Sequence, residues 1–406
     1  MILSRLAPLG ALALLACAAS SATARTTPRT TGLTLDRVVG LMRHGVRAPL
    51  DGEVPRGTRT AKPWPRWTTP ESELTPRGAE ALMAEARADR ARWIAQGLLP
   101  ATGCPAEGAV RIATNTSSRT IASGEAYARG LAPQCPVPVT HLPIGQVDPR
   151  FEPLRARATR FDAAAAVADI NRFTGGMDAL VARHRPALRL LDTVLGCGDP
   201  KGCDPAGPAR LTPSADGHGI DLSGPIRTAS GTAQVLLLQY AEGLSPSVGG
   251  VPVDGAMLAR LGGIHAALFD VYSRSPYMAA HQSAAFGRHL LDALTAPQGA
   301  RVDMLVGHDT NVTALAALLG FDLVAPGYAT NDAAPGGAIL IQRWHDRRGR
   351  AFVTLAYRTQ SPEQIRSHAA NVSVKPVQVR GCPVSAPCPL DRFVTLMRER
   401  LAPLAG

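Results

Sequence analysis

The sequence predicts an α/β protein whose sheet is assembled from both ends of the chain, with a mostly helical domain inserted between them. Strand patterns rich in valine, leucine and isoleucine occur before residue 150 and again after residue 300. Between them, residues 151–299 are rich in alanine, follow a helical periodicity and contain no convincing strand. Because strands alternate with helices on both sides of this segment, we expect residues 33–150 and 300–406 to form one α/β domain, with residues 151–299 as the insertion.

The first 24 residues have the pattern of a secretory signal peptide. Arg5 provides a basic start, an apolar run ends at Cys17, and small residues ending at Ala24 provide a cleavage site. The apolar run is too short to span a membrane. We therefore expect an exported protein, periplasmic or secreted, without an integral membrane span. Residues 14–17 also resemble an imperfect lipobox, so a lipid anchor on Cys17 is the alternative.

The cysteines support export. The chain has seven, and removal of Cys17 with the leader leaves an even number. Six cysteines allow many connectivities. In an oxidising compartment, local pairing predicts three disulfides, Cys104 to Cys135, Cys197 to Cys203, and Cys382 to Cys388.

The charge of the chain restricts its partners. There are 43 lysines and arginines against 32 aspartates and glutamates, a formal net charge of +11, and all but three of the basic residues are arginine. The arginines are scattered, and no basic patch or groove-reading motif accompanies them, so nucleic-acid binding receives little support. A positive charge suits a polyanionic substrate. The oligomeric state stays open.

The elements of the first part follow in order. An apolar run predicts a first strand at 35–42, and a loop rich in proline, glycine and tryptophan follows at 48–70. Thr75 and Pro76 suit the N-cap and first position of a helix that continues to Gly97. Beyond it the pattern predicts a strand at 110–113, a helix at 118–130 and a strand at 137–142.

After the insertion the strand pattern returns. It predicts a strand at 302–306, a helix at 311–319, strands at 338–344 and 351–357, and a closing helix at 391–401.

Polar residues gather where three of these strands end. The first strand leads into Arg43, His44 and Arg47, the second leads toward Arg119, and the strand at 302–306 leads into His308 and Asp309. In an open α/β sheet the site lies beyond the carboxyl ends of the strands, so we expect these segments to converge.

The residue types suit phosphoryl transfer. Arginine forks match phosphate oxygens. Positive neighbours would keep His44 neutral, and a neutral imidazole is a nucleophile toward phosphorus. Asp309 could protonate the departing oxygen.

These motifs carry a family resemblance. "RHGVRAP" at 43–49, "SSRTIASGEAY" at 117–127 and "GHDTN" at 307–311 together resemble the bacterial histidine acid phosphatases, the phytase and glucose-1-phosphatase branch of the histidine phosphatase superfamily. The resemblance implies a mixed α/β sheet beside an α-domain, and the three disulfides resemble bridges of that family. It makes His44 the nucleophile that forms a phosphohistidine and Asp309 the proton donor. Arg43, Arg47, Arg119 and His308 would hold the phosphoryl oxygens, and no metal or other cofactor is implied.

The substrate is less well determined. The first guess is myo-inositol hexakisphosphate (phytate), and the alternative is glucose 1-phosphate or a range of sugar phosphates. Leu50 and Asp51 stand where phytase-like relatives commonly place threonine and lysine, and a carboxylate facing a polyanion is unfavourable. Arg56 and Arg59 could compensate.

Two other classes of protein are alternatives to a histidine phosphatase. One is an inactive periplasmic protein that binds phosphorylated ligands. The other is a metal-dependent hydrolase, but His265, His281 and His289 lack a compact ligand spacing. For Asn115 the sequence predicts only a place in a glycosylation sequon.

Overall fold

The computed structural model describes residues 30–199, 202–204 and 206–402. The predicted signal peptide and Cys17 lie outside these residues. The helices are α1 (Pro76–Ala95), α2 (Ser118–Leu131), α3 (Ala163–Thr174), α4 (Met177–Leu195), α5 (Pro225–Glu242), α6 (Gly255–Tyr272), α7 (Pro276–Thr295), α8 (Asp309–Leu319), α9 (Pro362–Arg366) and α10 (Leu390–Leu401). The strands are β1 (Thr34–Arg43), β2 (Val110–Thr114), β3 (Val139–Thr140), β4 (Arg210–Pro213), β5 (Ile220–Ser223), β6 (Val302–Gly307), β7 (Ala338–His345), β8 (Ala351–Thr359), β9 (Ser373–Val377) and β10 (Cys388–Pro389).

Strands from both ends of the chain form one mixed sheet, in the order β10-β8-β7-β1-β6-β2-β3, with β9 paired to β8. The strands β1, β6, β2 and β3 run parallel to one another, whereas β7 runs antiparallel to β1. The α/β fold with a mixed sheet is therefore confirmed, and its central pair, β1 and β6, joins segments far apart in the sequence.

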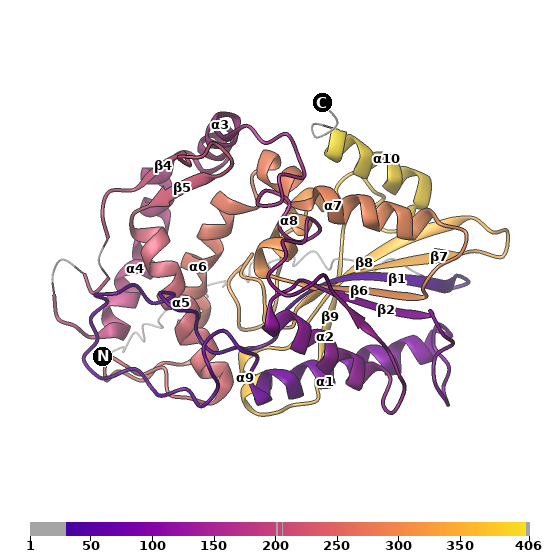
Figure 1. Cartoon of the computed structure of the whole chain (residues 1–406), viewed down its shortest axis with the longest axis horizontal. Helices are drawn as coiled ribbons and strands as arrows, with labels where there is room; N and C mark the ends of the chain where they lie inside the picture. The colour runs from indigo at the N-terminus through magenta and orange to yellow at the C-terminus, as the bar shows by residue number, and fades with distance from the viewer. Residues whose placement is uncertain (1–29, 200–201, 205, 403–406) are drawn as a thin grey trace, which may run out of the picture.

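The sheet is covered on both faces (Figure 1). In β1, Val38 and Met42 pack into a core with Trp93 of α1 and Tyr127 of α2. The alternate residues Val39 and Leu41 belong to the core that includes α7 and α8. Figure 1 accordingly shows α1 and α2 below the sheet, with α7, α8 and α10 above it. Burial of both faces explains why β1 is an apolar run rather than an alternating pattern.

The middle of the chain is mostly helical, as expected, but one expectation about it needs correction. Strands β4 and β5 form a two-stranded antiparallel hairpin in a region predicted to contain no strand. The two strands pair only with each other and are mostly exposed, so they lack the apolar run by which buried strands are recognised. Helix α7 falls within residues 151–299, yet it lies along the sheet beside α8 (Figure 1). The domain boundaries themselves remain a prediction.

The other predicted elements are present, with small differences at their ends. Thr75 is the N-cap of α1, and its side chain accepts a hydrogen bond from the backbone N–H of Gly78. Strand β3 is shorter than the predicted 137–142. The short elements α9, β9 and β10 were not predicted.

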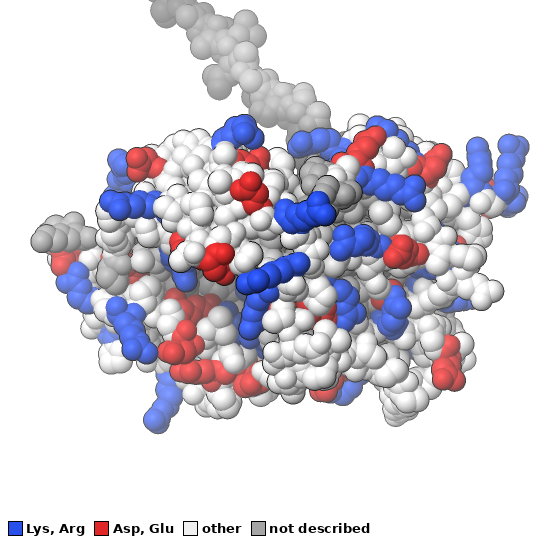
Figure 2. All heavy atoms as spheres, turned by 45° about the horizontal axis from the view of Figure 1, so that its top comes forward, with Lys and Arg blue, Asp and Glu red and all other residues white. Residues whose placement is uncertain are grey.

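Disulfides join the three cysteine pairs that local spacing predicts, Cys104 to Cys135, Cys197 to Cys203, and Cys382 to Cys388. No helix in the described part of the chain is both long and apolar enough to cross a membrane. On the face shown in Figure 2, basic and acidic side chains are interspersed rather than gathered into a single basic patch.

Candidate active site

The predicted site residues come together because of the strand register. Strands β1 and β6 pair so that Arg43 lies opposite Gly307, and the backbone N–H of His44 donates to the Gly307 carbonyl at 3.0 Å. On the other side of β6, Thr114 of β2 lies opposite Val306. The segments that follow β1, β2 and β6 therefore leave the sheet at the same edge, as the sequence predicts.

His44 is a buried, neutral imidazole. Its Nδ1 lies 2.8 Å from the Gly45 carbonyl oxygen. Because a carbonyl can only accept, Nδ1 carries the ring proton and Nε2 keeps its lone pair. Burial lowers the pKa of His44 well below its ordinary value, and the charges of Arg43, Arg119 and Arg47 lower it further. The ring is therefore unprotonated and nucleophilic at Nε2 near neutral pH.

Arg43 and Asp309 form an ion pair at the centre of the site. Arg43 is fully buried at the end of β1, and its Nη2 lies 2.9 Å from Oδ2 of Asp309, the first residue of α8. Burial alone would raise the pKa of Asp309, but the charge of Arg43 lowers it well below its usual range, with help from His265. Asp309 is therefore an anion in the ligand-free protein, and a bound phosphate dianion would have to favour its protonation.

Arg47 is held by a carboxylate that the sequence analysis did not identify. Its Nη1 and Nη2 donate to the two carboxylate oxygens of Glu53 at 2.6 and 2.8 Å. Asp51, the carboxylate expected to matter here, is exposed in a turn. Arg59, expected to compensate for it, instead pairs with Asp199 at 2.6 Å. Within the loop after β1, Glu53 is therefore the acidic side chain that contacts a site arginine.

Arg119 lies in the first turn of α2 and faces the same centre. Burial lowers its pKa and the charge of Arg47 lowers it further, whereas the charges of Asp309 and Glu53 raise it. Its Nη2 lies 3.5 Å from His308 Nδ1. Ser123, also on α2, accepts from the backbone N–H of Gly45 at 3.1 Å and so joins this helix to the segment after β1.

His308 is oriented by Asn115, which the sequence analysis missed. The amide Nδ2 of Asn115 donates to His308 Nε2 at 2.9 Å, while its Oδ1 accepts from Thr116. Acceptance at Nε2, the shorter of the two contacts, places the ring proton on Nδ1. Arg119 Nη2, 3.5 Å away, can only donate, so the two groups both present protons to an incoming anion rather than bonding to each other. Burial, followed by the charge of Arg119, lowers the pKa of His308 to about 3. The signal that could have found Asn115 is its position directly after a buried strand, equivalent to that of His44 and His308.

The three histidines considered as metal ligands have separate partners. His265 Nδ1 lies 2.8 Å from Asp332 Oδ1, His281 Nδ1 lies 2.7 Å from Thr159 Oγ1, and His289 Nε2 lies 3.0 Å from Asp303 Oδ2. Among the described residues, no cluster of three or more histidine, cysteine or acidic side chains could hold a metal ion. The arginine-rich centre is instead built to bind an anion.

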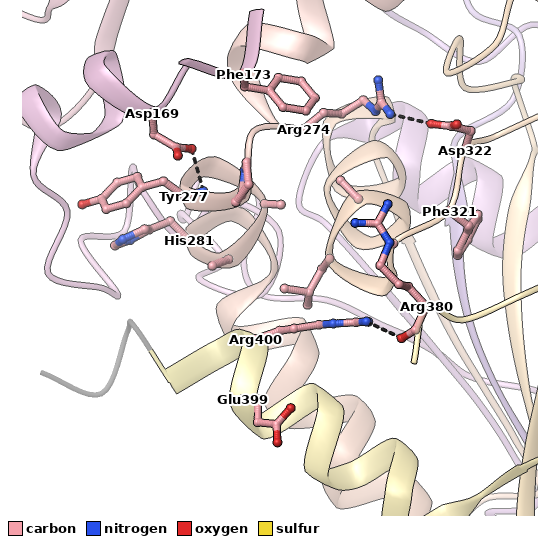
Figure 3. A pocket seen from close by; sticks show the side chains of 16 residues that line it. Asp169, Phe173, Arg274, Tyr277, His281, Phe321, Asp322, Arg380, Glu399 and Arg400 are labelled. Carbon is pink, nitrogen blue, oxygen red and sulfur yellow. Dashed lines mark hydrogen bonds and ion pairs between the residues drawn. The ribbon is translucent and has the colours of Figure 1, made fainter. Parts of the chain in front are cut away.

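A cavity of about 510 Å³ lies apart from this centre (Figure 3). It is lined by side chains that include Phe173, Arg274, Tyr277, Arg380 and Arg400. Arg274 donates to Asp322 at 2.7 Å, and Arg400 donates to the carbonyl of Arg380. None of the six predicted catalytic and substrate-binding residues lines this cavity.

Comparison with known proteins finds relatives among the histidine phosphatases. A sequence profile of the histidine phosphatase superfamily (branch 2) matches residues 34–169. Phytase AppA of Escherichia coli is 31% identical over 91% of this chain and 93% of its own length. Glucose-1-phosphatase of Salmonella typhimurium is 29% identical over 93% of this chain and 95% of its own length.

Solved structures agree as well. Hafnia alvei phytase in complex with myo-inositol hexakis sulphate has a TM-score of 0.81 and 29% identity, and covers 92% of this chain and 98% of its own. The same enzyme in complex with tartrate has a TM-score of 0.83 and 28% identity, with the same coverage. With the likeness extending over nearly the whole chain, the protein belongs to the histidine phosphatase superfamily.

Proposed function

We propose that the protein hydrolyses phosphomonoesters through a phosphohistidine on His44. Phytate is the first of two candidate substrates. The observation that carries the proposal is the buried, neutral ring of His44, with Nε2 unprotonated and arginine charges around it. Family membership supports the reaction class, and the similarity to phytases supports the substrate.

The first step transfers the phosphoryl group to the enzyme. His44 Nε2 forms a bond to phosphorus while the bond to the ester oxygen breaks, and the electron pair of that bond stays on the leaving oxygen. Arg43, Arg47 and Arg119 stabilise the charge on the other phosphoryl oxygens, and the Nδ1 proton of His308 adds a fourth donor. Asp309, which takes up a proton from solvent when the phosphate dianion binds, gives that proton to the leaving oxygen, so that the alcohol departs neutral.

The second step returns the enzyme to its starting state. A water molecule attacks the phosphohistidine, gives a proton to Asp309 and breaks the bond between phosphorus and Nε2. Inorganic phosphate leaves, His44 regains its lone pair, and Asp309 releases its proton to solvent once the negative charge of the phosphate has gone. Every step uses side chains of this chain, and the proton that Asp309 donates is restored by the water.

The second candidate substrate is glucose 1-phosphate or a related sugar phosphate. A specific observation favours it, because Glu53 neutralises Arg47 and so reduces the positive charge available to a polyanion. The similarity to a glucose-1-phosphatase points the same way. We further propose a periplasmic or secreted location, which the three disulfides support.

The test is phosphate release by the purified protein from phytate, glucose 1-phosphate and an aryl phosphate, at acid and neutral pH and with chelator. The His44→Ala variant should lose turnover on all three while keeping part of its affinity for inorganic phosphate. Wild-type enzyme quenched in alkali during turnover should carry one labelled phosphoryl group on histidine, because acid would hydrolyse the bond between nitrogen and phosphorus. Full activity of His44→Ala would contradict the mechanism, and loss of wild-type activity in chelator would indicate a metal-dependent hydrolase. No release from any ester would indicate a binding protein.

A further inference from the structure

The contact between Glu53 and Arg47 is a two-pronged ion pair that is largely shielded from water. The side chains are 5% exposed for Arg47 and 9% for Glu53. Besides the two bonds between them, Arg47 Nη1 donates to the Ala48 carbonyl at 3.1 Å, and Glu53 accepts from the backbone N–H of Leu50 at 2.8 Å. Both terminal nitrogens of Arg47 are therefore engaged before any phosphate arrives. A shielded, bidentate pair of this kind is stronger than an exposed one.

The segment that carries Glu53 is fixed in place by the helical part of the chain. A Cβ atom at Gly231 of α5 would collide with the Glu53 carbonyl oxygen, so this close approach depends on glycine. Farther along the same loop, the backbone N–H groups of Ala61 and Lys62 donate to Leu195 and Val248. Figure 1 shows this indigo loop running from the sheet to α4 and α5. These backbone contacts therefore hold the Glu53 carboxylate beside Arg47.

The pairing changes the charge that the site presents to a substrate. Arg43 is paired with Asp309 and Arg47 with Glu53. In the part of the chain that the structure describes, no carboxylate lies within ion-pair distance of Arg119. Before a substrate binds, the three arginines therefore keep one uncompensated positive charge, which suits the phosphate of a simple ester but favours a polyanion less.

We propose that Glu53 is a specificity-determining residue, whose hold on Arg47 favours esters with one phosphate group over polyphosphorylated esters such as phytate. The inference rests on the proposed phosphomonoesterase function and names the feature that separates its two candidate substrates. Glu53 does not take part in bond breaking. Its negative charge lies next to a guanidinium that would contact the reacting phosphate, so each additional phosphate group meets repulsion there.

The first test compares two substitutions that each remove one negative charge. Glu53→Gln keeps the shape of the side chain and an acceptor for the backbone N–H of Leu50. Asp51→Asn removes a charge only two residues away, from an exposed side chain. We expect Glu53→Gln to raise the ratio of kcat/KM on phytate to that on glucose 1-phosphate about five-fold or more, as one unit charge at close range would. Asp51→Asn should change the ratio much less, because solvent screens its charge.

A third substitution separates charge from positioning. Glu53→Asp keeps the negative charge but shortens the side chain, so it should keep a ratio close to that of the wild type. If Glu53 only positions Arg47, both Glu53 variants should lose activity on the two substrates equally, and the ratio should not change. That result, or an equal effect of Asp51→Asn, would overturn the proposal. Thermal unfolding and circular dichroism would verify that each variant is folded.

A binding measurement tests the inference without turnover. Myo-inositol hexakis sulphate carries six anionic groups on the same ring and lacks a phosphoryl group to transfer. In calorimetric titrations, Glu53→Gln should bind it several-fold more tightly than the wild type, with a smaller gain for inorganic phosphate. If the wild type hydrolyses neither ester, the proposed function fails, but this titration still decides the role of Glu53. Equal gains for the two anions would contradict discrimination by charge.

Discussion

Arg43 Nη2 lies 2.9 Å from Asp309 Oδ2, so the residue that ends β1 is ion-paired to the residue that begins α8. The pair links the two motifs that the sequence separates by more than 250 residues. It also helps to keep Asp309 ionised in the ligand-free protein, because the charge of Arg43 and the contributions of His265, His44 and His308 together lower the pKa of Asp309 more than burial raises it. The proton donation that we propose for Asp309 therefore depends on a bound phosphate, whose negative charge would offset that of Arg43.

The first prediction concerns leaving groups. Asp309→Asn removes the proton donor and preserves the size of the side chain. Turnover of glucose 1-phosphate, whose sugar oxygen needs a proton to leave, should fall by a factor of about 100 or more. An aryl phosphate with an acidic phenol should lose much less. Steady-state kcat on both substrates provides the measurement, and equal losses would contradict the assignment of Asp309.

The second prediction concerns pH. Because the pKa of Asp309 is well below its usual range, the protonated donor is scarce at neutral pH and becomes more populated as the pH falls. The histidine His308, with a pKa of about 3, stays neutral across this range. We expect kcat on glucose 1-phosphate to be higher at about pH 5 than at pH 7. A kcat that rises toward alkaline pH would exclude Asp309 as the general acid.

The third prediction concerns Asn115. Asn115→Leu removes the donor to His308 Nε2, so the ring proton is no longer fixed on Nδ1. We expect weaker binding of inorganic phosphate and a kcat/KM lower by a factor of about 10 to 100, by analogy with the loss of a residue that orients a metal-binding histidine. Nitrogen-15 NMR of the His308 ring should show a mixture of tautomers. A ring that still carries its proton on Nδ1 would show that Asn115 does not select the tautomer.

Much of the site could be predicted because it depends on short motifs and on strand order. His44 and His308 each follow an apolar strand, and parallel pairing of β1 with β6 brings the two strand ends together. What could not be predicted depends on contacts between distant segments. The contact of Glu53 with Arg47 depends on how the loop after β1 packs against Gly231, and the contact of Asn115 with His308 depends on the pairing of β2 with β6. Hairpin β4-β5 has no strand pattern in the sequence, because its residues are mostly exposed and therefore do not form an apolar run.

The last prediction concerns stability in acid, and it rests on His281. This buried ring lies 2.7 Å from Thr159 Oγ1, and its centroid is 4.3 Å from that of Tyr277. Burial lowers the pKa of His281 from 6.5 to about 4. Between these two values the unfolded chain binds a proton that the folded protein does not, so the free energy of unfolding should fall as the pH falls from 6.5 to 4.

His281→Asn tests this directly, since an asparagine amide can take the place of Nδ1 beside Thr159 without binding a proton. Urea unfolding at several pH values gives the slope of the free energy of unfolding against pH. This slope should be shallower for the variant than for the wild type, by an amount that corresponds to the uptake of up to about one proton on unfolding. His218→Asn, which removes an exposed histidine, serves as the control and should leave the slope unchanged. If His281→Asn lowers stability equally at every pH, the side chain matters for packing alone, and the acid sensitivity arises from another group.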